Sequence, residues 1–197
     1  MRQISYIHIV TIAHGKSEYC LCESIGSNLH LPIKNDANKK GNSSIQINGL
    51  CDWLSREHYR TPRSLCEFCG GRIELKGSEI VPPFALFPIM DVDDCEPNVA
   101  EAYKNGNLFS RIKLRDYITP IFNDPNLDEV MISMGYPINK GRKLESYQQI
   151  YPANRGDIET LRLLRQGFSN IYRTSGKTNM HLLLDACINE AEKALIK

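Results

Sequence analysis

The sequence ISYIHIVTIA (residues 4–13) decides the fold, and the turn HGKSE (residues 14–18) follows it directly. A nearly continuous run of β-branched and apolar residues is typical of a strand buried in the middle of a parallel sheet. Gly15 allows a tight turn, and Ser17 is expected to cap a helix that begins at Glu18 and ends at Gly26. The stretch therefore predicts the first strand-turn-helix unit of an α/β protein.

A second apolar run, FALFPIM (residues 84–90), predicts another buried strand, and it ends in the carboxylates Asp91, Asp93 and Asp94. Asp91 and Asp93 project from one face of a straight strand, and like charges this close repel unless a cation joins them or they face water. Few oxygen ligands, with room for water and phosphate, suit Mg²⁺ or Mn²⁺ better than zinc. We expect a divalent-metal site here; the alternative is a turn whose aspartates cap the next helix.

Apolar periodicity along the rest of the chain predicts alternating strands and helices. The expected segments are a short apolar segment over 29–33, an exposed loop over 35–42, helices over 45–54, 97–105 and 127–135, and a strand over 118–122. From Asp157 the apolar residues have helical spacing, so the C-terminal part, residues 157–197, is expected to be helical. The pattern predicts one α/β domain over residues 1–197, with a mixed or parallel central sheet flanked by helices.

Composition narrows the class of protein. The chain has 197 residues, 42% of them hydrophobic and 24% charged, which are ordinary values for one folded domain. No run approaches the roughly 18 apolar residues of a membrane span, and no signal peptide is evident, so a cytoplasmic protein without a membrane partner is expected. The net charge of +1 gives no overall field for nucleic acid. Contact with nucleic acid would have to come from a local basic cluster near the C-terminus, formed by Arg162, Arg165, Arg173 and Lys177. The alternative is that these residues form a solvated helix face.

The seven cysteines are expected to be reduced rather than paired in disulfides. Cys66 and Cys69 are spaced like half of a zinc knuckle, in which two thiolates around a tight turn hold one ion. Cys51 and His58 lie just upstream and are candidates for the other two ligands. A zinc-stapled insertion over residues 57–83 is therefore predicted, with reduced, partly buried cysteines as the alternative.

The order of these motifs resembles the Toprim superfamily, in which an apolar strand leads into a Glu-Gly-x-(Ser/Thr)-(Glu/Asp) turn and a second strand ends in Asp-x-Asp. The matching residues are Gly15, Ser17 and Glu18 for the first motif and Asp91 and Asp93 for the second. The chain departs from the pattern at His14, where the family has a glutamate that acts as general base or metal ligand. Histidine performs either role near neutral pH, or it marks a subunit without activity.

The resemblance extends to the RloB-like group of Toprim proteins, which is associated with restriction and phage-defence loci. The stretches NDPN (residues 123–126) and TNMH (residues 178–181) match that group. The resemblance implies a metal-dependent nuclease that cleaves DNA or RNA and works alongside an ATPase partner. The alternative is a degenerate module that binds nucleic acid or the ATPase.

The implied roles in that nuclease are specific. The resemblance implies that Asp91, Asp93 and Asp94, with Glu18, hold one or two Mg²⁺ or Mn²⁺ ions. His14 is the implied base or extra ligand, with a structural turn histidine as the alternative. Lys16 is expected to contact a phosphate, with a solvated turn lysine as the alternative.

Overall fold

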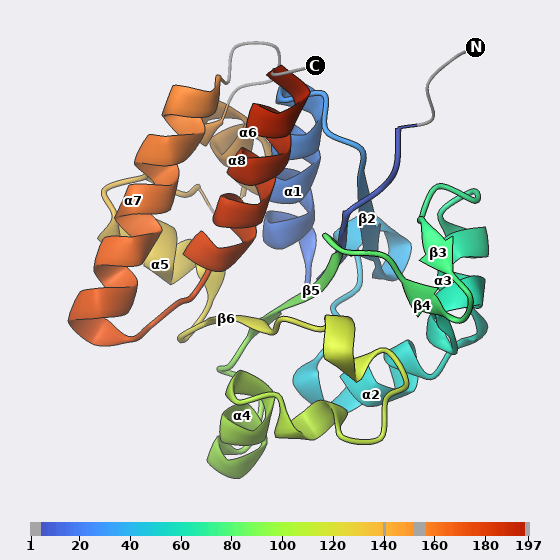
Figure 1. Cartoon of the computed structure of the whole chain (residues 1–197). Coiled ribbons are helices and arrows are strands. Elements are labelled where there is room, and N and C mark those ends of the chain that lie inside the picture. Colours follow the sequence, from blue (N-terminus) through green and yellow to red (C-terminus); the bar gives the residue numbers. More distant parts are fainter. Residues whose placement is uncertain (1–4, 140, 152–156, 196–197) are drawn as a thin grey trace.

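The computed structural model describes residues 5–139, 141–151 and 157–195, and Figure 1 shows the arrangement of its elements. Ile4, where the first strand was expected to begin, and residues 196–197 lie outside this part. The strands are β1 (Ile9–Ala13), β2 (Ile33–Ala37), β3 (Leu75–Lys76), β4 (Glu79–Ile80), β5 (Ala85–Asp91) and β6 (Ile121–Asn123). The α-helices are α1 (Lys16–Asn28), α2 (Ile47–Leu54), α3 (Pro62–Phe68), α4 (Pro97–Lys104), α5 (Leu127–Ser133), α6 (Lys143–Ile150), α7 (Ile158–Ser175) and α8 (His181–Leu195). Short 3₁₀ helices cover Asn38–Gly41, Glu57–Tyr59, Asn107–Phe109 and Arg115–Tyr117.

Within the described residues, the central sheet has four strands in the order β2-β1-β5-β6, and every neighbouring pair is parallel. The chain moves outward from β1 to β2 in one direction and from β5 to β6 in the other, so the direction reverses between β1 and β5. Register places Ala13 beside Ile89 and Asp91 beside Asn123, which aligns the carboxyl ends of the central strands. The predicted α/β class with a parallel sheet flanked by helices is confirmed.

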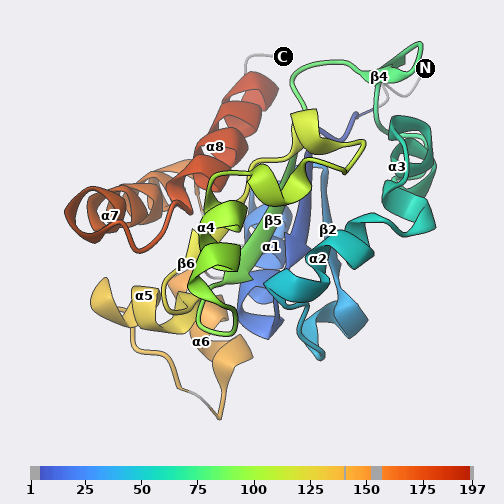
Figure 2. The ribbon, with the colours of Figure 1, turned by 90° about the horizontal axis from the view of Figure 1, so that it is seen from below.

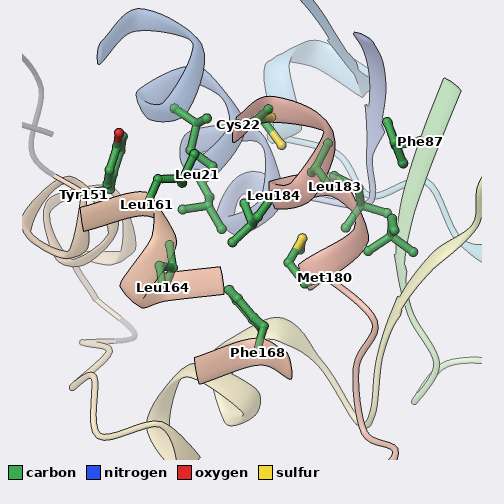
Figure 3. Close-up of a cluster of buried hydrophobic side chains, with 14 of the residues drawn as sticks. Leu21, Cys22, Phe87, Tyr151, Leu161, Leu164, Phe168, Met180, Leu183 and Leu184 are labelled. Carbon is green, nitrogen blue, oxygen red and sulfur yellow. The ribbon is translucent and has the colours of Figure 1, made fainter. Parts of the chain in front are cut away.

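Alternate residues of the central strands face two separate hydrophobic cores. Phe87 and Ile89 of β5 pack in a core with α1, α5, α6, α7 and α8, which we call the α1-side core. Leu86 and Met90 pack with α2, α3 and the loops around α4, in what we call the α2-side core. Figure 2 shows α7 and α8 on one side of the strands and α2 and α3 on the other. In the α1-side core, Figure 3 shows side chains of α1, α7 and α8 gathered together.

Three expectations about the first unit are wrong in detail. The strand β1 begins at Ile9 rather than Ile4, because the backbone before it leaves the sheet, and Ile7 N–H donates to the carbonyl of Arg72 at 2.6 Å. Gly15, not Ser17, is the N-cap of α1, and the helix continues through Gly26 to Asn28. Ser17 is buried and donates its hydroxyl to Asp128 instead.

Elsewhere the structure adds elements that the sequence pattern did not indicate. The strand β2 occupies the start of the expected loop over 35–42, as an edge strand whose polar side chains find partners, including Thr11 Oγ1 bonded to Asn35 Oδ1 at 2.7 Å. The stretch over 57–83 contains α3, capped by Thr61, and the short β3-β4 hairpin. The helix α6 lies where no helix was predicted.

Helices α7 and α8 make up the described portion of the C-terminal part and agree with the helical prediction. Asp157 caps α7 by accepting the N–H of Thr160 at 2.7 Å. No helix among the described residues combines the length and apolar character needed to span a membrane.

Candidate functional site

A polar cleft of about 330 Å³ opens where the turns after β1 and β5 meet. In open parallel sheets, ligands bind beyond the carboxyl ends of the strands, at the point where the strand order reverses direction. The cleft lies at this point, between β1 and β5. Five residues predicted from the sequence line it: His14, Lys16, Glu18, Asp91 and Asp93.

His14 is held at the end of β1 with a defined ring orientation. Its backbone N–H donates to Ile89 O at 2.8 Å, and its backbone carbonyl accepts the N–H of Ile45 at 2.8 Å. The ring Nδ1 lies 2.9 Å from the carbonyl oxygen of Ile45. Because a carbonyl only accepts, Nδ1 carries the proton in this bond, and Nε2 is the basic nitrogen of the neutral ring.

Glu18 is a buried carboxylate that lies in the first turn of α1. Its Oε2 accepts the backbone N–H of Gly15 at 2.9 Å, which satisfies an open amide at the start of the helix. Its other oxygen, Oε1, is buried and has no hydrogen-bond partner among the described residues. Burial raises the pKa of Glu18 above its usual value. Such a buried, unpaired oxygen is costly unless another ligand satisfies it.

Asp91 ends β5 and faces the α1 side of the sheet, as Phe87 and Ile89 do. Its Oδ1 accepts the backbone N–H of Leu127 at 3.0 Å and lies 3.5 Å from Asn123 Nδ2. Burial and the nearby charge of Glu18 raise the pKa of Asp91 to about 9. The structure therefore brings two poorly solvated carboxylates, one from the start of α1 and one from the end of β5, close enough for their charges to interact.

The other two aspartates of the motif differ in position. Asp93 is exposed in the cleft, and its Oδ2 accepts the side-chain amide of Asn126 at 3.0 Å. Asp94 does not line the cleft, and its buried Oδ1 has no partner among the described residues. The prediction that Asp94 binds the ion gains no support from this geometry.

Sequence reasoning missed a buried network around Asp128, on the first turn of α5. Asp128 Oδ1 accepts the hydroxyls of Ser17 at 2.9 Å and Tyr147 at 2.8 Å, and Oδ2 pairs with Lys143 Nζ at 2.6 Å. Burial opposes ionisation of Asp128, but these hydrogen bonds outweigh it and lower its pKa. Asp128 is thus a satisfied anion that holds Lys143 at the cleft. The acidic first turn after Asn126 is the one sequence signal that pointed to it.

Lys16 lies half-buried in the lining of the cleft, with Nζ 5.9 Å from the centre of the Tyr19 ring. Together, Lys16 and Lys143 place two ammonium groups around the carboxylates of the cleft. This combination of cations with carboxylates suits an anionic ligand that arrives with a divalent cation.

The structure gives the zinc prediction no support. Cys66 Sγ donates to Ile73 O at 3.2 Å, and burial raises the pKa of Cys69 to about 11, which disfavours the thiolate that zinc needs. Cys51 Sγ donates to Leu108 O at 3.4 Å, and the ring of His58 stacks on Phe68. The four predicted ligands are not grouped.

The fit of a divalent ion in the cleft depends on Glu18 and Asp91. Across the described residues, no three His, Cys, Asp or Glu side chains form a ready-made group of ligands. Mg²⁺, however, is commonly held by one or two carboxylates, with water and phosphate completing its shell. Such an ion would give the unpaired Glu18 Oε1 a partner. It would also stabilise the ionised form of Asp91, whose pKa is raised in the absence of a cation. Comparisons of the chain with protein-family models, with curated proteins and with solved structures give no match.

Proposed function

We propose that this protein is a Toprim-like, divalent-metal-dependent phosphodiesterase that cleaves nucleic acid. The observation that carries the proposal is the juxtaposition of Glu18 and Asp91, two buried carboxylates with raised pKa values; Glu18 lies in the first turn of the helix that follows β1, and Asp91 ends the adjacent parallel strand β5. The cations that flank them offer partners for the phosphate of a substrate.

Each residue has a role in this proposal. Glu18, Asp91 and Asp93 would hold Mg²⁺ or Mn²⁺, which when bound lowers the pKa of water and stabilises charge on the leaving oxygen. Lys16 and Lys143 bind the non-bridging phosphate oxygens. The basic Nε2 of His14 accepts a proton from the attacking water, because the bond to Ile45 leaves that nitrogen free.

The test is cleavage of plasmid DNA, single-stranded DNA and RNA by the purified protein in Mg²⁺ or Mn²⁺. We expect cleavage that EDTA stops and that Asp91→Ala and Glu18→Gln each lower by at least about 100-fold. Asp116→Asn, which changes an exposed carboxylate outside the cleft, is the matched control and should retain full activity. Equal loss in the control, or cleavage that survives Asp91→Ala, would contradict the assignment.

The position of His14 favours one second candidate, a module that binds nucleic acid or a partner ATPase without cutting. The ring occupies the place of the glutamate of the Toprim motif and is tied to Ile45. This candidate predicts nucleic-acid or ATPase binding with no metal-dependent cleavage. Restoring the carboxylate with His14→Glu would then create cleavage, whereas in an active enzyme the same change would leave or lower it.

A further inference from the structure

A second hollow, of about 320 Å³, adjoins the cleft and shares Ser44 with it. Its walls come from the loop after β2, from one face of α2 with its N-cap Gln46, Gly49 and Trp53, and from Arg56, which follows the end of that helix in an extended conformation. The backbone of Ile45 is bonded to His14 on both sides, which fixes this wall relative to the cleft. The two hollows are therefore neighbouring parts of one polar groove.

Arg56 presents a flat cationic surface in this second hollow. Its guanidinium carbon lies 3.6 Å from the centre of the Trp53 ring, and the indole N–H of Trp53 donates to Asp36 at 3.2 Å. Trp53 is buried while Arg56 is exposed, so the outer face of the guanidinium is open to a ligand. Arg56 joins no ion pair within the described part of the chain. A planar guanidinium held in this way can stack on an aromatic base.

Two further cations lie on the loop after β2, next to Asn38, which lines the second hollow. Lys39 and Lys40 are exposed and have positive φ angles of 49° and 55°. Neither side chain is in an ion pair within residues 5–139. Gly41, which follows them, packs so closely on the turn after β1 that an added Cβ would lie 2.8 Å from Gly15 O. The loop that carries these two unpaired ammonium groups is therefore packed against the turn that lines the cleft.

The three arginines of the basic cluster near the C-terminus, by contrast, are already bonded to partners from the same chain. Arg165 forms two bonds to Asp185, Arg162 pairs with Glu159 and Glu192, and Arg173 bonds to Asn170. Over residues 38–60, the exposed charged side chains are four cations and two carboxylates: Lys39, Lys40, Arg56, Arg60, Asp52 and Glu57. The exposed side chains over residues 38–60 therefore carry a net positive charge, whereas Arg162 and Arg165 of α7 are already paired with carboxylates.

We propose that the second hollow binds single-stranded nucleic acid and leads it into the cleft, which deepens the proposed function and rests on it. One base stacks on Arg56, and Lys39 and Lys40 contact the phosphates on either side. Single strands are favoured because only an unpaired, unstacked base exposes a face to the guanidinium. The stacking is indifferent to base identity, so little sequence preference is expected.

The test measures binding of fluorescent 12-nucleotide DNA and RNA, single-stranded and duplex, by anisotropy in EDTA. We expect Arg56→Lys, which keeps the charge and removes the plane, to weaken single-strand binding roughly tenfold. Lys39→Gln and Lys40→Gln should each reduce the slope of log affinity against log salt by about 0.7. Arg111→Lys, at an exposed arginine that lines neither hollow, is the matched control and should bind as the wild type does. Unchanged affinity in Arg56→Lys, or duplex bound as tightly as single strands, would overturn the proposal.

A small substrate separates this proposal from the proposed function. Hydrolysis of methyl 4-nitrophenyl phosphate, a phosphodiester without a base, in Mn²⁺ needs only the cleft, so Arg56→Lys should leave it unchanged. Hydrolysis of this ester together with unaltered oligonucleotide binding in Arg56→Lys would refute the hollow alone. Loss of single-strand binding in Arg56→Lys without any hydrolysis would support the hollow and refute the phosphodiesterase.

Discussion

Burial beside Glu18 makes Asp91 a source of pH-dependent stability. The pKa of Asp91 is raised to about 9 in the folded protein, against about 3.9 in an unfolded chain. Between these values the folded state binds a proton that the unfolded state has released, so the free energy of unfolding falls as pH rises. The cost of the buried charge is absent below about pH 4 and fully present above about pH 9.

We therefore expect Asp91→Asn to stabilise the protein in EDTA at about pH 8, by on the order of 2 kcal/mol, and to have little effect near pH 4. Urea denaturation at both pH values measures this difference. The exposed control Asp116→Asn should show no such pH dependence. Destabilisation by Asp91→Asn at the higher pH would mean that the carboxylate is well satisfied without a cation.

The same carboxylate predicts how metal affinity depends on pH. A bound cation requires the ionised form, so binding of Mn²⁺ releases a proton and tightens by up to about tenfold per pH unit below the pKa of Asp91. Calorimetry in buffers of different ionisation enthalpy measures both the affinity and the proton. Binding of equal strength at about pH 6 and pH 8 would exclude Asp91 as a ligand.

Among the individual site residues, those that follow the buried strands were predicted from the sequence. Glu18 and Asp91 follow apolar runs that could only be buried strands, and parallel strands place such ends together. Asp128 and Lys143 escaped prediction because α5 and α6 deliver them by tertiary packing. Nothing in the local pattern around Lys143 distinguishes it from an exposed lysine.

Among the elements, the short 3₁₀ helix Asn38–Gly41 depends on one glycine. Gly41 has a φ of 81°, and an added Cβ would lie 2.8 Å from Gly15 O. We expect Gly41→Ala to destabilise the protein by about 2 kcal/mol or more and to weaken single-strand binding, since the loop must move away from the cleft.

Gly106→Ala is the matched control for this prediction. Gly106 has a nearly equal φ of 79°, but nothing lies within 4 Å of an added Cβ. It therefore reports the cost of the backbone conformation alone, about 1 kcal/mol. Thermal unfolding compares the two variants, and equal losses would show that the contact with Gly15 is unimportant.

Prediction of the elements succeeded where burial imposes a periodic pattern. The strand β5 and the helices α4 and α5 carry such patterns and were expected within a few residues, β1 was expected but with too early a start, and the C-terminal part was expected to be helical without a division into α7 and α8. The strand β2 was not predicted because it is an edge strand with polar residues. Its side chains bond to partners such as Thr11 and Trp53, which no local sequence pattern reveals. Gly26 was mistaken for a helix end because a glycine inside a helix and one that ends it look alike in sequence.

For the whole molecule, the two cores on opposite faces of the sheet carry the stability. Leu164 and Leu163 are neighbours on α7, but Leu164 is 2% exposed in the α1-side core whereas Leu163 is 67% exposed. We expect Leu164→Ala to cost about 2 to 5 kcal/mol and Leu163→Ala less than about 0.5 kcal/mol. Urea denaturation measures both, and similar losses would mean that α7 is not packed as described.

The pairing of β1 with β5 also sets when the cleft can exist during synthesis. When the nascent chain has emerged from the ribosome only as far as β2, His14 and Glu18 are already present. At that stage β1 can already pair with β2. Asp91 follows only after α2, α3 and the small hairpin have emerged, and Asp128 and Lys143 come later still. The nascent chain therefore carries half of a cleft through much of its translation. Any chemistry of the complete site must wait until the start of α6 has been made.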